Sequence, residues 1–280
     1  MSKGDHQMSG QTSPAEALSD FEKTDFTHFG KTRTIYRRGH GPAVIIIAEM
    51  PGITPKVLEF ARKVSDIGCT AVLPSLFGID GLDPNDSGPA DLAKVAASLI
   101  PTCISSEFTT LATGKSSPVV TWLRALAAHE HIRCGGPGVG AIGMCFTGGF
   151  ALAMATDERL LAPVLAQPSL PFRPINALAG NIDISPEELD TVKGRCANGL
   201  QVLGVRFKGD RISPPKRFEF LRKQLGDAFV AIELDDSAAG PSPMPPHSAL
   251  TEHLIDEPGQ PTRAALDEVL DLFRRRLLTY

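Results

Sequence analysis

Short apolar segments that alternate with helical patterns constrain the fold of this chain more than any other feature. The first two predicted strands cover Thr32–Gly39 and Ala43–Glu49, and a turn over residues 39–42 joins them. The second is apolar and β-branched nearly throughout, which is typical of a strand covered on both faces of a sheet. Five further strands are predicted: Thr70–Pro74, Gly138–Met144, Ala162–Gln167, Leu200–Phe207 and Ala228–Leu234.

Helical patterns separate most of these strands. In the segment 55–68, apolar residues recur at helical spacing and Gly68 ends the pattern. Ser185 is a predicted N-cap with Glu188 as its capping-box partner. Strands that alternate with helices predict an α/β fold with a mostly parallel central sheet and helices on both faces. Other helices are predicted over residues 91–99, 118–131, 147–157, 185–198, 214–226 and 261–278, with a loop over 75–90.

Length and composition fit one large globular domain. The chain has 280 residues, of which 42% are hydrophobic, so it can bury a sizeable core. We expect a polar N-terminal tail over residues 1–20 and a single domain over residues 21–280. The formal net charge of −4, without a Lys/Arg block, argues against a nucleic acid or a membrane surface as partner.

Cysteine usage and the N-terminal residues bear on the compartment. The five cysteines are scattered and form no CxxC pair, so neither a disulfide framework nor a zinc site is predicted. His129, His131 and Cys134 lie close in sequence, but alternate residues of a helix face different ways, so we interpret them as surface residues. The first residues form no apolar leader, and no apolar run reaches about 18 residues. We expect a cytoplasmic protein.

One cysteine stands among small residues, in the segment GAIGMCFTGGF over residues 140–150. Cys145 directly follows a predicted strand, at the edge where such sheets bind ligands. A nucleophile on a sharp strand-to-helix turn needs small neighbours, which Gly143 and Gly148 supply. The start of a helix also favours a thiolate over a thiol. The pattern predicts a nucleophilic Cys145; a buried structural cysteine or a phosphate-binding turn is the alternative, although no GxGxxG or GxxxxGK[ST] spacing is present.

A triad built on such a turn needs an acid and a base later in the chain. Asp210 directly follows the strand 200–207, where a carboxylate can reach the strand ends; alternatively, it only caps the next helix. His247 lies in a loop after the last strand, and loops over strand ends carry catalytic groups. His253 is predicted on a helix with charged neighbours, hence at the surface. Asp210 and His247 are therefore the predicted acid and base.

Four segments, IIIAEMPGIT, GMCFTGG, GDRISP and PPHSALTEHL, together resemble the dienelactone hydrolase family of the α/β-hydrolase fold. The resemblance covers nearly the whole chain beyond the tail. It implies a carboxymethylenebutenolidase-like hydrolase of small esters or lactones, and we expect no cofactor or metal. By this similarity Cys145 is the nucleophile, His247 the general base and Asp210 its orienting carboxylate. Glu49 matches the family's glutamate that helps to activate the thiol when substrate binds. The expected partner is a small-molecule substrate, and the protein a monomer or small homo-oligomer.

A cysteine, a histidine and an aspartate support acyl transfer in two steps. A thiolate attacks the carbonyl carbon, and His247 then activates water. The backbone N–H groups of Phe146 and Met50 are the candidate oxyanion hole, because Pro51 has no N–H. A Glu49 carboxylate beside the sulfur disfavours the thiolate by like-charge repulsion. This is consistent with a nucleophile kept inactive until substrate displaces the carboxylate.

Some positions depart from the family pattern. The two arginines that hold a substrate carboxylate in the family are not matched: one position falls in SLFGIDG and the other is Thr251. Arg173 and Arg211 are candidate replacements, and Thr147 stands where glycine is usual. The sequence leaves open whether the loop 237–246 is a lid.

Two other functions remain as alternatives. A non-catalytic binding or redox-sensing protein would use Cys145 as an oxidisable thiol, but would need no acid behind its histidine. An acyltransferase would keep the chemistry and change the acceptor.

Overall fold

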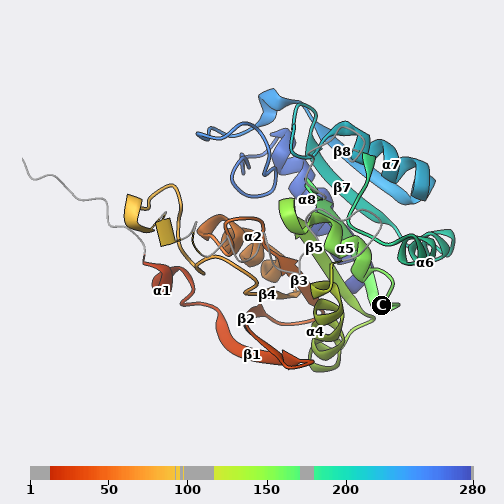
Figure 1. Ribbon diagram of the computed structural model, residues 1–280, viewed down its shortest axis with the longest axis horizontal. Coiled ribbons are helices and arrows are strands. Elements are labelled where there is room, and N and C mark those ends of the chain that lie inside the picture. Colours follow the sequence, from red (N-terminus) through yellow and green to blue (C-terminus); the bar gives the residue numbers. More distant parts are fainter. Residues whose placement is uncertain (1–12, 92, 95–96, 98–116, 171–179, 279–280) are drawn as a thin grey trace, which may run out of the picture.

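A central sheet organises the computed structural model, which describes residues 13–91, 93–94, 97, 117–170 and 180–278. The eight strands of these residues follow the order β1-β2-β4-β3-β5-β6-β7-β8 (Figure 1). Their bounds are β1 Glu22–His28, β2 Lys31–Gly39, β3 Ala43–Ile47, β4 Thr70–Pro74, β5 Val139–Met144, β6 Leu160–Ala166, β7 Val202–Phe207 and β8 Phe229–Leu234.

Strand direction confirms the predicted mostly parallel sheet. β2 runs antiparallel to both β1 and β4, and the other neighbouring pairs are parallel. The carboxyl ends of β3, β5, β6 and β7 therefore lie along one edge. In sheets of this kind, that edge is where ligands bind.

Helices cover both faces of the sheet, as predicted (Figure 1). Alternate residues of β3 show the division, because successive side chains of a strand point to opposite faces. Val44 and Ile46 pack with α2 and α8, whereas Ile45 and Ile47 pack on the other face, and all four are fully buried. The helix bounds are α2 Pro55–Asp66 and α8 Pro261–Phe273 on one face, and α4 Val119–Cys134, α5 Gly148–Met154, α6 Pro186–Ala197 and α7 Pro215–Leu225 on the other.

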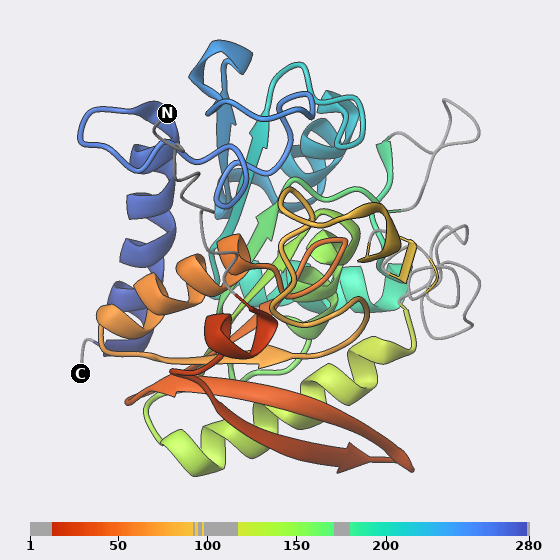
Figure 2. The same ribbon diagram turned by 90° about the vertical axis from the view of Figure 1, so that its left-hand side faces the viewer.

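The sequence patterns did not predict the first strand, β1. β1 pairs with β2 in a hairpin at one edge of the sheet, beside α4 (Figure 2). Its residues alternate between exposed and half-buried, so the segment has no apolar run that would indicate a strand. The predicted helix 91–99 lies partly outside the described residues, and the chain is already helical at residues 89–91.

The end of the predicted N-terminal tail packs against the domain. Residues 1–12 lie outside the described residues, but Pro14–Ala17 forms the short helix α1. Ala17 is buried in the same core cluster as α2, and Arg62 of α2 donates a hydrogen bond to its carbonyl at 2.8 Å. Within the described part of the chain, no helix combines the length and apolar character needed to cross a membrane.

Candidate active site

Cys145 lies directly after β5, where a 3₁₀ turn (Cys145–Thr147) leads into α5. Its φ angle is 51°, a left-handed conformation that costs a residue with a Cβ on the order of 1–2 kcal/mol. A strained residue at a strand-to-helix turn is the geometry of a nucleophile elbow, which exposes the side chain above the strand ends.

Two glycines make this turn possible. A Cβ added to Gly143 would overlap the carbonyl oxygen of Thr147, and one added to Gly148 would lie 2.5 Å from Cα of Pro168. Real Cβ atoms essentially never approach backbone atoms so closely. Both positions therefore require glycine for space, as the predicted elbow demands.

Thr147 joins the elbow to the neighbouring strand instead of crowding it. The side chain is fully buried, and its hydroxyl accepts a hydrogen bond from the backbone N–H of Met144 at 2.9 Å. The same hydroxyl donates to the carbonyl of Ile47, at the end of β3, at 2.8 Å. The threonine in place of a glycine thus links the turn of Cys145 to the strand that leads to Glu49.

Asp210 and His247 form a buried pair. Asp210 follows β7 by three residues, and its Oδ2 lies 2.6 Å from Nδ1 of His247. Its Oδ1 accepts the backbone N–H groups of Ile212 at 2.8 Å and Ser213 at 3.1 Å. Since α7 begins only at Pro215, the carboxylate holds its own turn and the imidazole, and does not cap that helix.

The charge of this pair follows from its surroundings. Burial lowers the pKa of His247, but the hydrogen bond to Asp210 and the adjacent Cys145 sulfur outweigh burial and raise that pKa to about 10. Burial raises the pKa of Asp210, while His247 and two backbone N–H groups lower it below the usual value. These interactions favour the imidazolium form of His247 beside the Asp210 carboxylate. Nε2 of His247 is buried without a hydrogen-bond partner among the described residues.

Ser169 is a neighbour of the sulfur that sequence reasoning missed. Its Oγ lies 3.3 Å from Sγ of Cys145, and its backbone N–H donates to the Cys145 carbonyl at 2.9 Å. The side chain is buried. Ser169 follows β6 by three residues, and this place beyond a strand end is the signal that could have indicated it.

Glu49 is buried two residues after β3 and is held by neutral groups. Its Oε2 accepts hydrogen bonds from Oγ of Ser248 at 2.5 Å and from Nε2 of Gln167 at 3.1 Å. Its Oε1 accepts one from the hydroxyl of Thr251. Glu49 and Cys145 line the same cavity, but among the described contacts the carboxylate oxygens bind these three donors and not the sulfur.

The prediction of a helical, exposed His253 is wrong. The residue lies in a turn with 1% of its surface exposed, because the turn directs it inward while its neighbour Glu252 stays half-buried at a cavity. Its Nδ1 accepts the backbone N–H of Ser248 at 3.2 Å, and Nε2 lies 3.2 Å from the carbonyl of Met244. The ring packs edge-on against Phe207 of β7. His253 thereby ties the loop that carries His247 to the strand that leads to Asp210.

These side chains meet at a cavity of about 180 Å³. Met50 lines the same cavity, and Phe146 follows Cys145 in the elbow. From the loop 237–246, Met244 reaches the cavity. The cavity is lined by titratable side chains, among them Glu49, Cys145 and His247, and by apolar ones, among them Met50, Pro51, Pro55, Ile212 and Met244.

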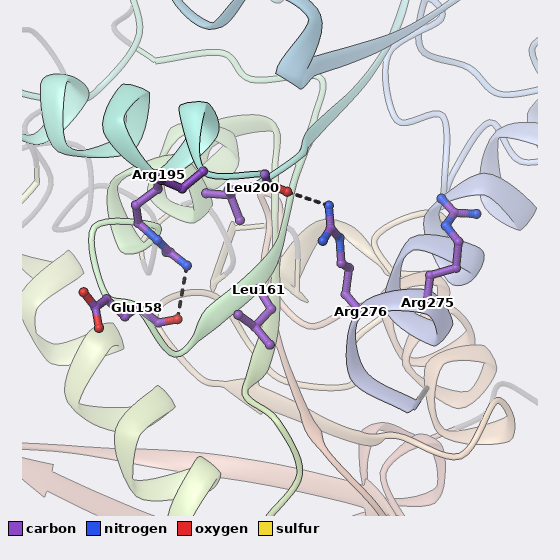
Figure 3. Close-up of a pocket in the computed structure, with 8 residues that line it drawn as sticks. Glu158, Leu161, Arg195, Leu200, Arg275 and Arg276 are labelled. Carbon is purple, nitrogen blue, oxygen red and sulfur yellow. Dashed lines mark hydrogen bonds between the residues drawn. The ribbon is translucent and has the colours of Figure 1, made fainter. Parts of the chain in front are cut away.

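A second hollow, of about 420 Å³, lies near the beginning of β6 (Figure 3). Arg195 donates there to four backbone carbonyls, including that of Glu158, and Arg276 donates to the carbonyl of Gly199. The residues that line this hollow include no cysteine, serine, threonine or histidine. Arg195 and Arg276 hold backbone segments together, so the cavity at Cys145 is the candidate active site. Within the described ranges, no cluster of three or more His, Cys, Asp or Glu side chains could bind a metal ion.

Comparison with known families identifies the family of this chain. The model of the dienelactone hydrolase family matches residues 32–184, more than half of the chain. The chain belongs to the dienelactone hydrolase family. Membership implies a hydrolase on an α/β-hydrolase fold. No match was found among the curated proteins.

Solved structures of dienelactone hydrolases share the fold at low sequence identity. A putative dienelactone hydrolase from Klebsiella pneumoniae has a TM-score of 0.59 at 18% identity, over 91% of this chain and 98% of that one. A dienelactone hydrolase from Anabaena variabilis has a TM-score of 0.57 at 14% identity, over 92% and 99%. A dienelactone hydrolase-like promiscuous phosphotriesterase from metagenomic libraries has a TM-score of 0.56 at 16% identity, over 92% and 98%.

The dienelactone hydrolase pattern is modified around Glu49. Thr251, at the position of one family arginine, donates to the Glu49 carboxylate. Arg211 does not line the cavity, and Arg173 lies outside the described residues. Among the described residues, the Glu49 carboxylate is thus bound by one amide and two hydroxyls.

Proposed function

We propose that this dienelactone hydrolase family member hydrolyses small carboxylic esters or lactones through a thioester on Cys145. One observation supports the proposal above the others: the strained Cys145 and the buried His247–Asp210 pair line or adjoin one cavity at the carboxyl ends of the strands. The triad order of nucleophile, acid and base along the chain is that of α/β-hydrolases.

In the first step, the Cys145 thiolate attacks the carbonyl carbon of the substrate. The developing oxyanion faces the backbone N–H groups of Phe146 and Met50. As the tetrahedral intermediate collapses, the C–O bond breaks, and Nε2 of the His247 imidazolium gives its proton to the departing oxygen. The products of this step are an alcohol and a thioester; for a lactone, the alcohol remains attached to the acyl group.

In the second step, His247 acts as a base because the Cys145 sulfur is now part of an uncharged thioester. The Cys145 sulfur contributes to the raised pKa of His247, and a thioester sulfur bears no negative charge. The pKa of His247 therefore falls once the acyl group is attached, and the neutral ring accepts a proton from water. The hydroxide adds to the thioester, the C–S bond breaks, and the acid leaves. The thiolate is released, and His247 is again protonated for the next cycle.

The test compares Cys145→Ala and Cys145→Ser with the wild type on 4-nitrophenyl acetate and on a neutral lactone. We expect the alanine variant to lose at least roughly 10³-fold in kcat, as happens when a nucleophile is removed. Mass spectrometry of the wild type, quenched during turnover, should find the acyl group on the peptide that contains Cys145. Cys134→Ala, which changes a half-buried cysteine on α4, is the matched control and should keep the wild-type rate.

A wild type without turnover, or a Cys145→Ala variant that keeps its rate, would refute the proposed nucleophile. Alcohol acceptors added to the same assay distinguish hydrolysis from acyl transfer. We expect acid as the main product at alcohol concentrations well below that of water.

A further inference from the structure

We propose that the cavity selects its substrate by charge: it favours an ester that carries a cationic group over the neutral isostere, and the neutral ester over one that carries a carboxylate. This rests on the proposed esterase function and names its substrate class. It points away from the acidic dienelactone that the family name suggests.

Three carboxylates line the cavity, and none of them has a cationic partner among the described residues. Glu49 is bound by the neutral side chains described above. Asp83 accepts the backbone N–H of Asn85 at 2.9 Å. Both oxygens of Glu252 accept Nδ2 of Asn85, at 3.0 and 3.2 Å, and Oε1 also accepts the hydroxyl of Ser242 at 3.0 Å. Hydrogen bonds from neutral groups hold these carboxylates in place without cancelling their charge.

Each of the two cationic side chains in the described lining lies beside a carboxylate. His247 pairs with Asp210, which neutralises the imidazolium. Lys56 is half exposed, and its Nζ lies 3.1 Å from a carboxylate oxygen of Glu59, which does not line the cavity. With the His247–Asp210 pair counted as neutral, the described lining holds three carboxylates, of Glu49, Asp83 and Glu252, against the one ammonium group of Lys56.

The carboxylates line the same cavity as Cys145, so their charge acts on a substrate bound there. Asn85 binds Asp83 through its backbone N–H and Glu252, 167 positions later in the chain, through its side chain, so two distant loops form one part of the wall. The same cavity contains Cys145 and the buried, unpartnered Nε2 of His247, which point to a bound reacting group. Apolar side chains such as Met50, Pro51 and Ile212 line the same cavity. Walls of low dielectric constant concentrate the field of fixed charges inside a cleft.

Coulomb's law sets the size of the effect. A unit charge about 8 Å from one carboxylate, at an effective dielectric constant between about 80 and 20, changes an affinity by roughly 2- to 30-fold. Salt screens exposed charges, so the selectivity should shrink as ionic strength rises.

The experiment measures kcat/KM on two matched series at low and high salt. The acyl series has 4-nitrophenyl esters of 6-(trimethylammonio)hexanoic acid, of hexanoic acid and of adipic acid as its monoester. The alcohol series compares acetylcholine with 3,3-dimethylbutyl acetate, its neutral isostere. In at least one series we expect the cationic ester to exceed the neutral one by roughly 2- to 30-fold at low salt, and the adipate monoester to be the poorest acyl substrate.

Two isosteric variants test the residues. Asp83→Asn and Glu252→Gln keep an oxygen acceptor for Asn85 and remove the charge, so each should reduce the ratio of cationic to neutral turnover. Asp190→Asn makes the same charge change on an exposed position of α6, away from the cavity, and should leave the ratio unchanged. Equal kcat/KM for all charges, a preference for the adipate monoester, or ratios that both variants leave unaltered would overturn the inference. Turnover of the neutral esters would still support the proposed function, whereas its absence would refute that function first.

Discussion

Asp210 divides its carboxylate between His247 and its own turn: Oδ2 lies 2.6 Å from Nδ1 of the ring, and Oδ1 accepts two backbone N–H groups. In Asp210→Asn, Oδ1 can still hold the turn, but an amide N–H would face the ring and could not stabilise an imidazolium. We expect kcat/KM on 4-nitrophenyl acetate to fall by roughly 10²- to 10⁴-fold with little loss of secondary structure.

Asp235→Asn serves as the control for this change, because Asp235 is an exposed partner of Lys208. It should keep the wild-type rate. An Asp210→Asn enzyme as active as this control would show that the pair is structural only.

His247 makes stability depend on pH in a defined direction. Its pKa rises from 6.5 to about 10 in the folded protein, so its contribution to the free energy of unfolding is full below pH 6.5 and is lost as the pH rises through about 10. The lowered pKa of Asp210 acts oppositely: its contribution is present above its ordinary pKa and is lost as the pH falls through the lowered value. Urea titrations from pH 6 to 10 should show a decline in the wild type that His247→Gln lacks.

The Cys145 sulfur helps to raise the pKa of His247. The pKa of His247 should therefore be lower in Cys145→Ala than in the wild type. An NMR titration of the imidazole C–H signals measures this directly in both proteins. The same value in Cys145→Ala and wild type would contradict the proposed loss of proton affinity on acylation.

Thr147 should stabilise the elbow through its hydroxyl and not only through its volume. Thr147→Val keeps the shape, but leaves the Met144 N–H and the Ile47 carbonyl without this partner, at a cost of about 1–3 kcal/mol in unfolding free energy. Thr147→Ser retains the hydroxyl and should recover most of both stability and kcat. If the serine variant is as impaired as the valine variant, the hydrogen bonds are not the cause.

A glycine-to-alanine substitution should have opposite effects on stability at an elbow glycine and at a glycine inside a helix. Gly143→Ala places a Cβ against the Thr147 carbonyl and should destabilise by more than about 2 kcal/mol, or prevent folding. Gly194→Ala, in the interior of α6 with nothing within 4 Å of its Cβ, should instead stabilise by about 0.5–1 kcal/mol. Denaturant midpoints of the two variants check both signs, and a tolerated Gly143→Ala would contradict the tight turn.

Most of the fold follows from local pattern. The predicted strand 138–144 and helix 55–68 differ from β5 and α2 by only one or two residues at an end, because both elements are strongly apolar on the faces they bury. β1 has no such signal, since an edge strand gains its stability from pairing with β2 more than from apolar burial. His253 shows the converse error: charged neighbours suggested an exposed helix, but a turn directs the ring inward.

Local pattern also places Cys145 after a strand, between the glycines it needs, with Asp210 and His247 later in the chain, because backbone strain and turn chemistry depend on neighbours in sequence. The environment of Glu49 required the folded chain. Its donors Gln167, Ser248 and Thr251 are 118, 199 and 202 positions away, and nothing in their own segments indicates a buried carboxylate. The same holds for Asp83 and Glu252, which come to line one cavity only in the folded chain, where Asn85 binds both. Hydrogen bonds and cavity charge depend on distance in space, and for these groups that distance is set by the packing of the whole sheet.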